Sequence, residues 1–126
     1  MRPVVYDTGV LIAADRSERR TWAEHRVRLE VGIVPLVPAP VVAQASRSPA
    51  QAQMRRLLRG CDVVPLDEAA AHVAGALLGR TRTTDVVDAS VAALAMRHEA
   101  DVVSDDAQDI RRLLSAVRAR VAILDV

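Results

Sequence analysis

Four aspartates stand where their side chains could act together in chemistry. Asp7 directly follows one apolar run, and Asp105 follows another with a single serine between them. Asp85 and Asp88 are three residues apart at the start of a predicted helix, so both lie on one face of its first turn. Carboxylates packed close together raise one another's pKa unless a cation neutralises them.

Oxygen ligands of this kind predict a hard divalent cation. Mg²⁺ and Mn²⁺ prefer oxygen donors, and they hold water and phosphate while the protein fixes only a few positions. Such an ion lowers the pKa of a bound water to make a nucleophile, and a second ion could stabilise the leaving oxygen. The predicted chemistry is therefore metal-dependent hydrolysis of a phosphodiester bond, with one or two ions.

Each aspartate also has a purely structural interpretation. Acids in the first turn of a helix are favoured by the helix dipole, which would account for Asp85 and Asp88. Asp105 or Asp106 could cap the helix that follows. Asp7 is harder to explain in this way, because Thr8 is available to cap the next helix.

The aspartates can meet only if strands and helices alternate along the chain. Short apolar runs predict the strands, while capping residues and three-to-four spacing predict the helices. The second strand contains Pro35 and should be short or at an edge of the sheet. Strands are expected at 4–6, 33–37, 61–65, 102–103 and 121–124, and helices at 10–14, 21–32, 41–45, 48–60, 67–79, 85–100 and 107–117. This alternation predicts a parallel sheet with functional groups beyond the carboxyl ends of its strands.

Composition narrows the class of protein. The chain has 126 residues, of which 51% are apolar, so a single domain over residues 1–126 is expected. Cys61 is the only cysteine, and neither a signal peptide nor a membrane span is predicted, which favours a cytoplasmic protein. All 17 basic residues are arginine, so mechanisms that need a lysine amine are excluded.

The three acidic stretches resemble the first, third and fourth motifs of the PIN-domain family, in that order. They read VVYDTGVLIA at 4–13, DVVDASVAALA at 85–95 and VSD at 103–105. The resemblance extends over almost the whole chain. It implies an α/β fold, a PIN-like three-layer sandwich whose central, mostly parallel sheet of four to five strands is flanked by helices.

The same resemblance implies a function and a set of site residues. Asp7, Asp88 and Asp105 would be the catalytic residues and metal ligands, and Asp85 would be an accessory ligand. The protein would be a Mg²⁺- or Mn²⁺-dependent endoribonuclease, the VapC-type toxin of a type II toxin–antitoxin pair. Its partners would be an RNA substrate, a VapB-like antitoxin and a second copy of the chain in a homodimer, with no membrane.

Gln44 is a departure from the family pattern. The second motif usually carries a glutamate, where the stretch 41–45 offers this amide. The amide can orient a water or a ligating carboxylate, but the site is one charge short, which Asp85 could replace. The alternative function is therefore a catalytically weak PIN domain that binds RNA or a protein partner. A receiver-like phosphoacceptor, the third hypothesis, is excluded by the missing lysine.

Two weaker patterns have two interpretations each. Arginine pairs, Arg80 and Arg82 first among them, could carry an RNA backbone toward the metal or could form solvated helix faces. Trp22, Leu11 and Val42 could form a groove for an amphipathic antitoxin segment or could complete the core of the monomer.

Overall fold

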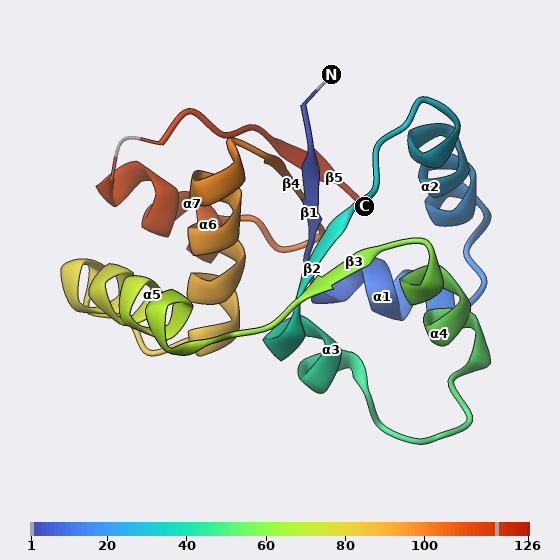
Figure 1. The fold of residues 1–126 in the computed structure, drawn as a ribbon, viewed down its shortest axis with the longest axis horizontal. Helices are drawn as coiled ribbons and strands as arrows, with labels where there is room; N and C mark the ends of the chain where they lie inside the picture. Colours follow the sequence, from blue (N-terminus) through green and yellow to red (C-terminus); the bar gives the residue numbers. More distant parts are fainter. Residues whose placement is uncertain (1, 118) are drawn as a thin grey trace.

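Five parallel strands form one sheet at the centre of the protein (Figure 1). The computed structural model describes residues 2–117 and 119–126. In chain order the strands are β1 Val4–Tyr6, β2 Leu36–Pro38, β3 Asp62–Val64, β4 Asp101–Ser104 and β5 Ile123–Asp125. Their spatial order is β3-β2-β1-β4-β5, and every neighbouring pair is parallel. The expected α/β fold with a parallel central sheet is confirmed.

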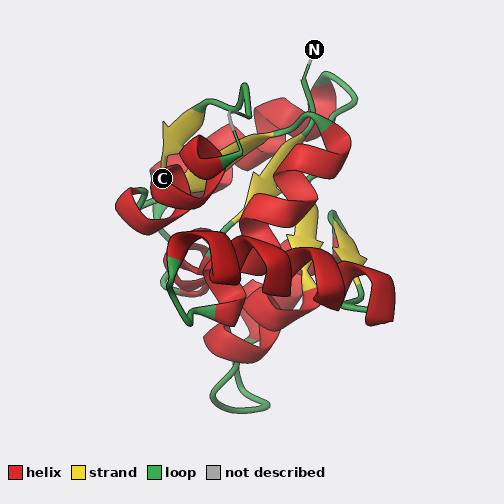
Figure 2. Ribbon diagram, turned by 90° about the vertical axis from the view of Figure 1, so that its left-hand side faces the viewer, coloured by secondary structure: helices red, strands yellow, loops and turns green. Residues whose placement is uncertain are grey.

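Helices cover both faces of this sheet. They are α1 Thr8–Asp15, α2 Arg19–Glu30, α3 Ala39–Ala45, α4 Ala52–Arg59, α5 Glu68–Thr81, α6 Val86–His98 and α7 Gln108–Ala116. On one face α1 packs against α2, α3 and α4, and on the other α5, α6 and α7 pack against one another (Figure 1). Figure 2, seen from the side of this second group, shows the helices in front of the strands. In the described part of the chain, the helices are too short or too polar to cross a membrane.

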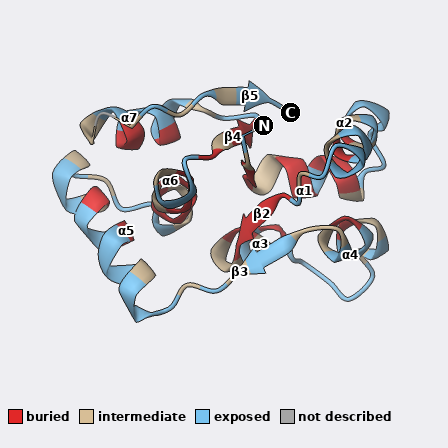
Figure 3. Cartoon of the chain, turned by 45° about the horizontal axis from the view of Figure 1, so that its top comes forward, coloured by how far each residue is buried: buried red, intermediate tan, exposed pale blue. Residues whose placement is uncertain are grey.

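Burial follows the position of each strand in the sheet. All three residues of β1 and all three of β2 are buried, whereas β3 and β5 at the edges are mostly exposed (Figure 3). A strand that is covered on both faces must be apolar throughout, which is why β1 reads as an uninterrupted apolar run. The strand β2 is short, as expected from Pro35, but it lies inside the sheet and not at an edge.

Two predicted helix starts are wrong. The helix α2 begins at Arg19, with Glu18 at its N-cap, so Thr21 does not form the expected capping box. Thr21 is instead a buried residue within the helix, only 4% exposed. Its hydroxyl looked like a cap in the sequence, but the packing of α2 on the core places it in a helical turn.

The helix α4 begins at Ala52, later than the Ser48-Pro49 pair predicted. The side chain of Gln51 explains the delay, because its Oε1 accepts hydrogen bonds from the backbone N–H groups of Arg47 (2.6 Å) and Ser48 (3.1 Å). These bonds hold the preceding segment as a loop.

The fold brings two strand ends to the same place. Strands β1 and β4 are neighbours, with Tyr6 opposite Val103. The backbone N–H of Asp7 continues the pairing beyond β1 by donating to the carbonyl oxygen of Val103 at 3.0 Å. The residues that follow these strands, Asp7 and Asp105, therefore share one edge of the sheet.

Candidate active site at the acidic rim of the sheet

Asp7 is held rigidly between two elements. Its Oδ1 accepts from the backbone N–H of Thr8 at 2.8 Å, and its Oδ2 accepts from the hydroxyl of Ser104 at 2.8 Å. Burial raises the pKa of this carboxyl, the two hydrogen bonds lower it, and the charges of Asp105 and Asp106 raise it further. Asp7 is thus a nearly buried acid, 6% exposed, whose orientation is fixed by its neighbours.

The expectation that Thr8 caps the first helix is wrong. Asp7 itself is the N-cap of α1, and Thr8 is the first residue of that helix. The position of an acid after a strand therefore does not by itself distinguish a functional role from capping. The contact with Ser104, which comes from β4, is what ties Asp7 to a second part of the rim.

Asp105 lies directly against α1. A Cβ atom added at Gly9 would overlap the carboxylate of Asp105, so a larger residue would force this side chain to move. The expectation that Asp105 or Asp106 caps the next helix is wrong. The N-cap of α7 is Ala107, whose methyl group cannot accept a hydrogen bond. The placement of Asp105 beside Asp7 therefore has no explanation in capping.

Asp85 and Asp88 reach the rim from the start of α6. Asp85 is the N-cap, and its carboxylate accepts from the backbone N–H of Asp88 at 3.0 Å. The capping interpretation is thus correct for Asp85. Burial raises the pKa of Asp88 to about 7, with further contributions from the charges of Asp85, Asp7, Asp109 and Asp106, in that order.

These six aspartates form what we call the acidic rim. Its members are Asp7, Asp85, Asp88, Asp105, Asp106 and Asp109. Asp109 was missed from the sequence because it lies in the first turn of α7 and looks like an ordinary helix acid. A hollow of about 310 Å³ lies beside the rim, lined by Thr83, Thr84, Asp85, Asp88, Asp109 and Leu113. The rim therefore combines like charges with an open space next to them.

The donor set of the rim fits a hard divalent cation by its chemistry. All its donors are oxygens, and they carry the same charge, so a cation would relieve their repulsion. Within residues 2–117 and 119–126, no three His, Cys, Asp or Glu side chains are already arranged around one point as a ligand set. Binding a cation would therefore require rotation of the exposed carboxylates, such as that of Asp105.

Gln44 lies at the border of the rim. The hydroxyl of Thr8 donates to Oε1 of Gln44 at 2.5 Å, which connects α1 to α3. Thr8 is also the residue whose backbone N–H binds Asp7. Thr8 thus contacts both residues, since its hydroxyl donates to Gln44 and its backbone N–H donates to Asp7.

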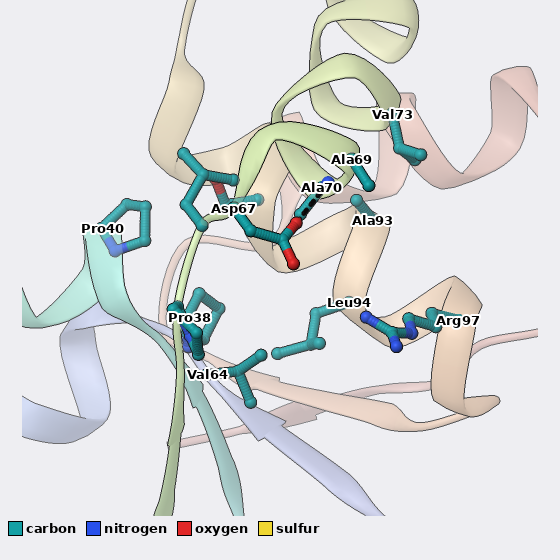
Figure 4. A pocket seen from close by; sticks show the side chains of 13 residues that line it. Pro38, Pro40, Val64, Asp67, Ala69, Ala70, Val73, Ala93, Leu94 and Arg97 are labelled. Atoms are coloured by element: carbon teal, nitrogen blue, oxygen red, sulfur yellow. Dashed lines mark hydrogen bonds between the residues drawn. The ribbon is translucent and has the colours of Figure 1, made fainter.

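A second hollow, an apolar groove, lies away from the acids, between β2, β3, α5 and α6 (Figure 4). Its wall is formed by side chains such as Pro38, Val64, Val73 and Leu94. Two charged residues, Asp67 and Arg97, also line it. Asp67 caps α5 by accepting from the N–H of Ala70 at 2.8 Å. We call this the apolar groove. Its volume, about 310 Å³, equals that of the hollow at the rim, but its lining suits contact with another apolar surface.

The structure also places the weaker sequence candidates. Leu11 is 0% exposed and belongs to the core, so the core interpretation is correct for it. Trp22 is half-buried, and its indole N–H donates to the carbonyl oxygen of Ala14 at 3.0 Å. The guanidinium of Arg56 lies over the Trp22 ring, 4.1 Å from its centre. Arg80 and Arg82 are exposed. Arg82 directly precedes Thr83, which lines the hollow beside the acidic rim.

Comparison with known proteins adds an independent finding. The family profile described as PIN domain matches residues 4–113. The fold is similar to VapBC2 from Rickettsia felis bound to a DNA fragment from their promoter, with a TM-score of 0.70 and 12% identity over 98% of each chain. It is also similar to DNA-bound VapBC from Salmonella typhimurium, with a TM-score of 0.69 and 19% identity over 99% of this chain and 98% of that chain.

A toxin–antitoxin complex from Klebsiella pneumoniae is a further similar structure. The TM-score is 0.64 and the identity 17%, over 84% of this chain and 88% of that chain. No curated protein sequence matches the chain. At these identities the structural matches establish the fold.

Proposed function

Because this chain belongs to the PIN domain family, we propose that it is a metal-dependent endoribonuclease and the toxin of a type II toxin–antitoxin pair. The family match over residues 4–113 confirms the resemblance to the PIN-domain family. PIN domains are generally nucleases, which supports a hydrolase. The choice of RNA as substrate and of Mg²⁺ or Mn²⁺ as cofactor is part of the proposal.

The acidic rim is the observation that carries this proposal. The pKa of Asp88 is raised to about 7 by burial and by neighbouring carboxylates, a perturbation typical of functional sites. Asp7, Asp88 and Asp105 are proposed as the catalytic residues and the ligands of Mg²⁺ or Mn²⁺, with Asp85 as a further ligand. When bound, the ion supplies positive charge for phosphodiester hydrolysis.

The chain's own residues would prepare this site. Ser104 and the N–H of Thr8 hold both carboxylate oxygens of Asp7, so its orientation does not change when substrate arrives. Gly9 keeps space for the carboxylate of Asp105. Asp85 fixes the first turn of α6 and thereby the position of Asp88. Such support lowers the cost of assembling the site.

The proposed protein partners are a VapB-like antitoxin and a second copy of the chain. The antitoxin is supported by the fold's similarity to structures described as VapBC and as a toxin–antitoxin complex.

The second copy is proposed to cover the apolar groove, in which Val73 is 47% exposed. Asp67 and Arg97 line the same groove, so a two-fold axis could pair each with its opposite charge. Light scattering should then show a dimer for wild type and a monomer for Val73→Asp.

The function is tested by incubating purified protein with RNA in Mn²⁺ and in excess EDTA. Cleavage should occur with Mn²⁺, should be absent in EDTA and should be absent in Asp88→Asn under both conditions. Undiminished cleavage in EDTA would contradict the metal dependence.

Expression of the protein alone should arrest growth, and co-expression of the cognate antitoxin should restore it.

The alternative is a catalytically weak PIN domain that binds RNA or a protein partner. It is favoured by one observation, the amide of Gln44 at the border of the rim where an acid would add charge. RNA that is bound but not cut in the presence of saturating Mn²⁺ would support this alternative over the nuclease.

A further inference from the structure

Thr8 and Gln44 form a side-chain pair at the border of the acidic rim. The hydroxyl of Thr8 donates to Oε1 of Gln44 at 2.5 Å, within hydrogen-bond range for two oxygens. Thr8 belongs to α1 and Gln44 to α3, two helices that pack against each other. The pair is therefore a contact between elements that holds one end of the Gln44 amide.

The negative charge of the rim favours this orientation of the amide. Side-chain amide dipoles align in the electric field of the protein, and the field here comes from Asp7, bonded to the Thr8 backbone, and from the other acids. The field favours the orientation in which the oxygen of Gln44 accepts from the hydroxyl of Thr8 and the NH₂ group is the free end of the amide. In the described part of the chain, Nε2 of Gln44 has no hydrogen-bond partner of its own.

We infer that Gln44 binds a phosphate oxygen of the RNA substrate through its Nε2 hydrogens. The inference rests on the proposed ribonuclease function, which it deepens by assigning a residue to the substrate. Nε2 offers only donors, which suit an anionic phosphate oxygen and are unfavourable toward a metal cation. Gln44 is exposed, so a substrate lying along the rim can reach it.

A neutral donor has an advantage at this position. An arginine or lysine beside the rim would form ion pairs with the carboxylates and compete with the cation for them. An amide can donate to a phosphate without neutralising Asp7 or Asp88. Gln44 would therefore hold substrate next to the acids and leave their charge available for the cation.

The competing role for Gln44 is that of a metal ligand through Oε1. That oxygen already accepts from Thr8, although a carbonyl oxygen has a second lone pair. The two roles make opposite predictions for Gln44→Leu, which removes both the donor and the acceptor. Since Gln44 is exposed, this variant should fold normally.

Two measurements on the full-length protein separate the roles. The first is the dissociation constant for Mn²⁺, measured by titration calorimetry without RNA. The second is the RNA concentration that half-saturates single-turnover cleavage at saturating Mn²⁺. For Gln44→Leu we expect an unchanged Mn²⁺ constant and a half-saturating RNA concentration about ten- to a hundredfold higher, which is the effect of losing one hydrogen bond to a charged group.

Gln44→Glu and Gln53→Glu form a matched pair. Both variants add one negative charge, but Gln53 lies at the start of α4, next to Met54, whose N–H donates to Asp15 at the opposite end of α1 from Thr8. Gln44→Glu should weaken RNA saturation at saturating Mn²⁺ as Gln44→Leu does, because a carboxylate cannot donate a hydrogen bond to phosphate. Gln53→Glu should saturate with RNA as the wild type does.

The outcomes distinguish this inference from the function on which it rests. Weaker Mn²⁺ binding by Gln44→Leu, or RNA saturation equal to the wild type, overturns the role of Gln44 alone, while wild-type cleavage still supports the nuclease. A wild-type protein that neither binds nor cleaves single-stranded or structured RNA overturns both.

Discussion

Tyr6 and Asp7 are consecutive residues that belong to two polar clusters of opposite character. The hydroxyl of Tyr6 lies 2.8 Å from Nδ1 of His25 and accepts from Nη1 of Arg28 at 3.1 Å. Glu24 pairs with Arg28 at 3.8 Å. We call these residues, Tyr6, Glu24, His25 and Arg28, the tyrosine cluster. Asp7 points instead into the acidic rim, where its neighbours carry the same charge.

Protonation differs between the two clusters. Burial raises the pKa of Tyr6 to about 12, and burial together with Arg28 lowers the pKa of His25. Both groups are therefore neutral at pH 7, and the only charges in the tyrosine cluster are of opposite sign. In the acidic rim the raised pKa of Asp88, about 7, comes partly from carboxylates that form no salt bridge within residues 2–117 and 119–126.

The two clusters differ in their effect on stability. A cluster whose donors and acceptors satisfy one another contributes to stability. A cluster of like charges costs stability and persists where a ligand completes it. The first prediction is thus that changes in the acidic rim affect catalysis, whereas changes in the tyrosine cluster affect folding.

The largest effect is expected for Asp7→Asn and Asp88→Asn. Each removes one of the proposed anionic ligands while keeping the shape of the side chain. RNA cleavage should fall by at least two to three decades, on the order of 3–4 kcal/mol of transition-state stabilisation. Single-turnover rates at saturating Mn²⁺ are the measurement.

Asp106→Asn is the matched control for this prediction. It also removes one charge from the rim, but Asp106 is the second residue after β4 and is expected to point away from the cation. Cleavage should change by less than about fivefold, well under the effect of losing an anionic ligand. A loss as large as that of Asp88→Asn would move the centre of the site toward Asp106.

Gly9→Ala is expected to separate activity from stability. The added methyl group would collide with the carboxylate of Asp105 and displace it. Misplacing a catalytic group by about 1 Å can cost about a hundredfold in rate, so we expect a loss of about ten- to a hundredfold. Alanine is a better helix former than glycine, so urea unfolding should show equal or higher stability. Lower stability with unchanged cleavage would refute the role of Gly9.

Tyr6→Phe should have the reverse effect. It removes the hydroxyl that contacts His25 and Arg28 while keeping the buried ring. We expect a loss of about 1–2 kcal/mol in the free energy of unfolding, because two partners lose a buried hydrogen bond. Cleavage per folded molecule should stay within about twofold, since none of the proposed metal ligands is changed. Denaturant unfolding and cleavage assays on one preparation test both parts.

The smallest effect concerns the pH dependence of stability without metal. The pKa of Asp88 is raised from the 3.8 of an ordinary aspartate to about 7 in the fold, so the folded chain binds more protons between these values. Stability in EDTA should therefore fall as the pH rises from about 4 to about 7. Asp88→Asn should reduce this dependence. Identical pH profiles of stability for the two proteins would show that the pKa of Asp88 is not raised in the fold.

Much of the acidic rim was predictable from sequence because parallel strands end at one edge. Asp7 and Asp105 follow apolar runs, and the pairing of β1 with β4 then places them together. The packing of Asp105 against Gly9 was not predictable, because it depends on where two distant segments touch. The contact of Thr8 with Gln44 has the same origin.

The errors have a local cause. Residues with good capping chemistry predicted helix starts at Thr21 and Ser48, but tertiary contacts decided otherwise. Thr21 is buried in α2, and Gln51 captures the backbone N–H of Ser48. His25 carried no signal in the sequence, because its partner Tyr6 comes from a strand 19 residues earlier.

The most direct test of the central claim is the effect of Mn²⁺ on thermal unfolding. If the acidic rim is completed by a cation, saturating Mn²⁺ should raise the unfolding midpoint of wild type, since a ligand that binds only the folded state stabilises it by about 2.7 kcal/mol at a hundred times its Kd. Tyr6→Phe, although less stable, should show the same rise, and Asp88→Asn should show little or none. Equal rises in wild type and Asp88→Asn, or no rise in wild type, would contradict the assignment of the rim as the cation site.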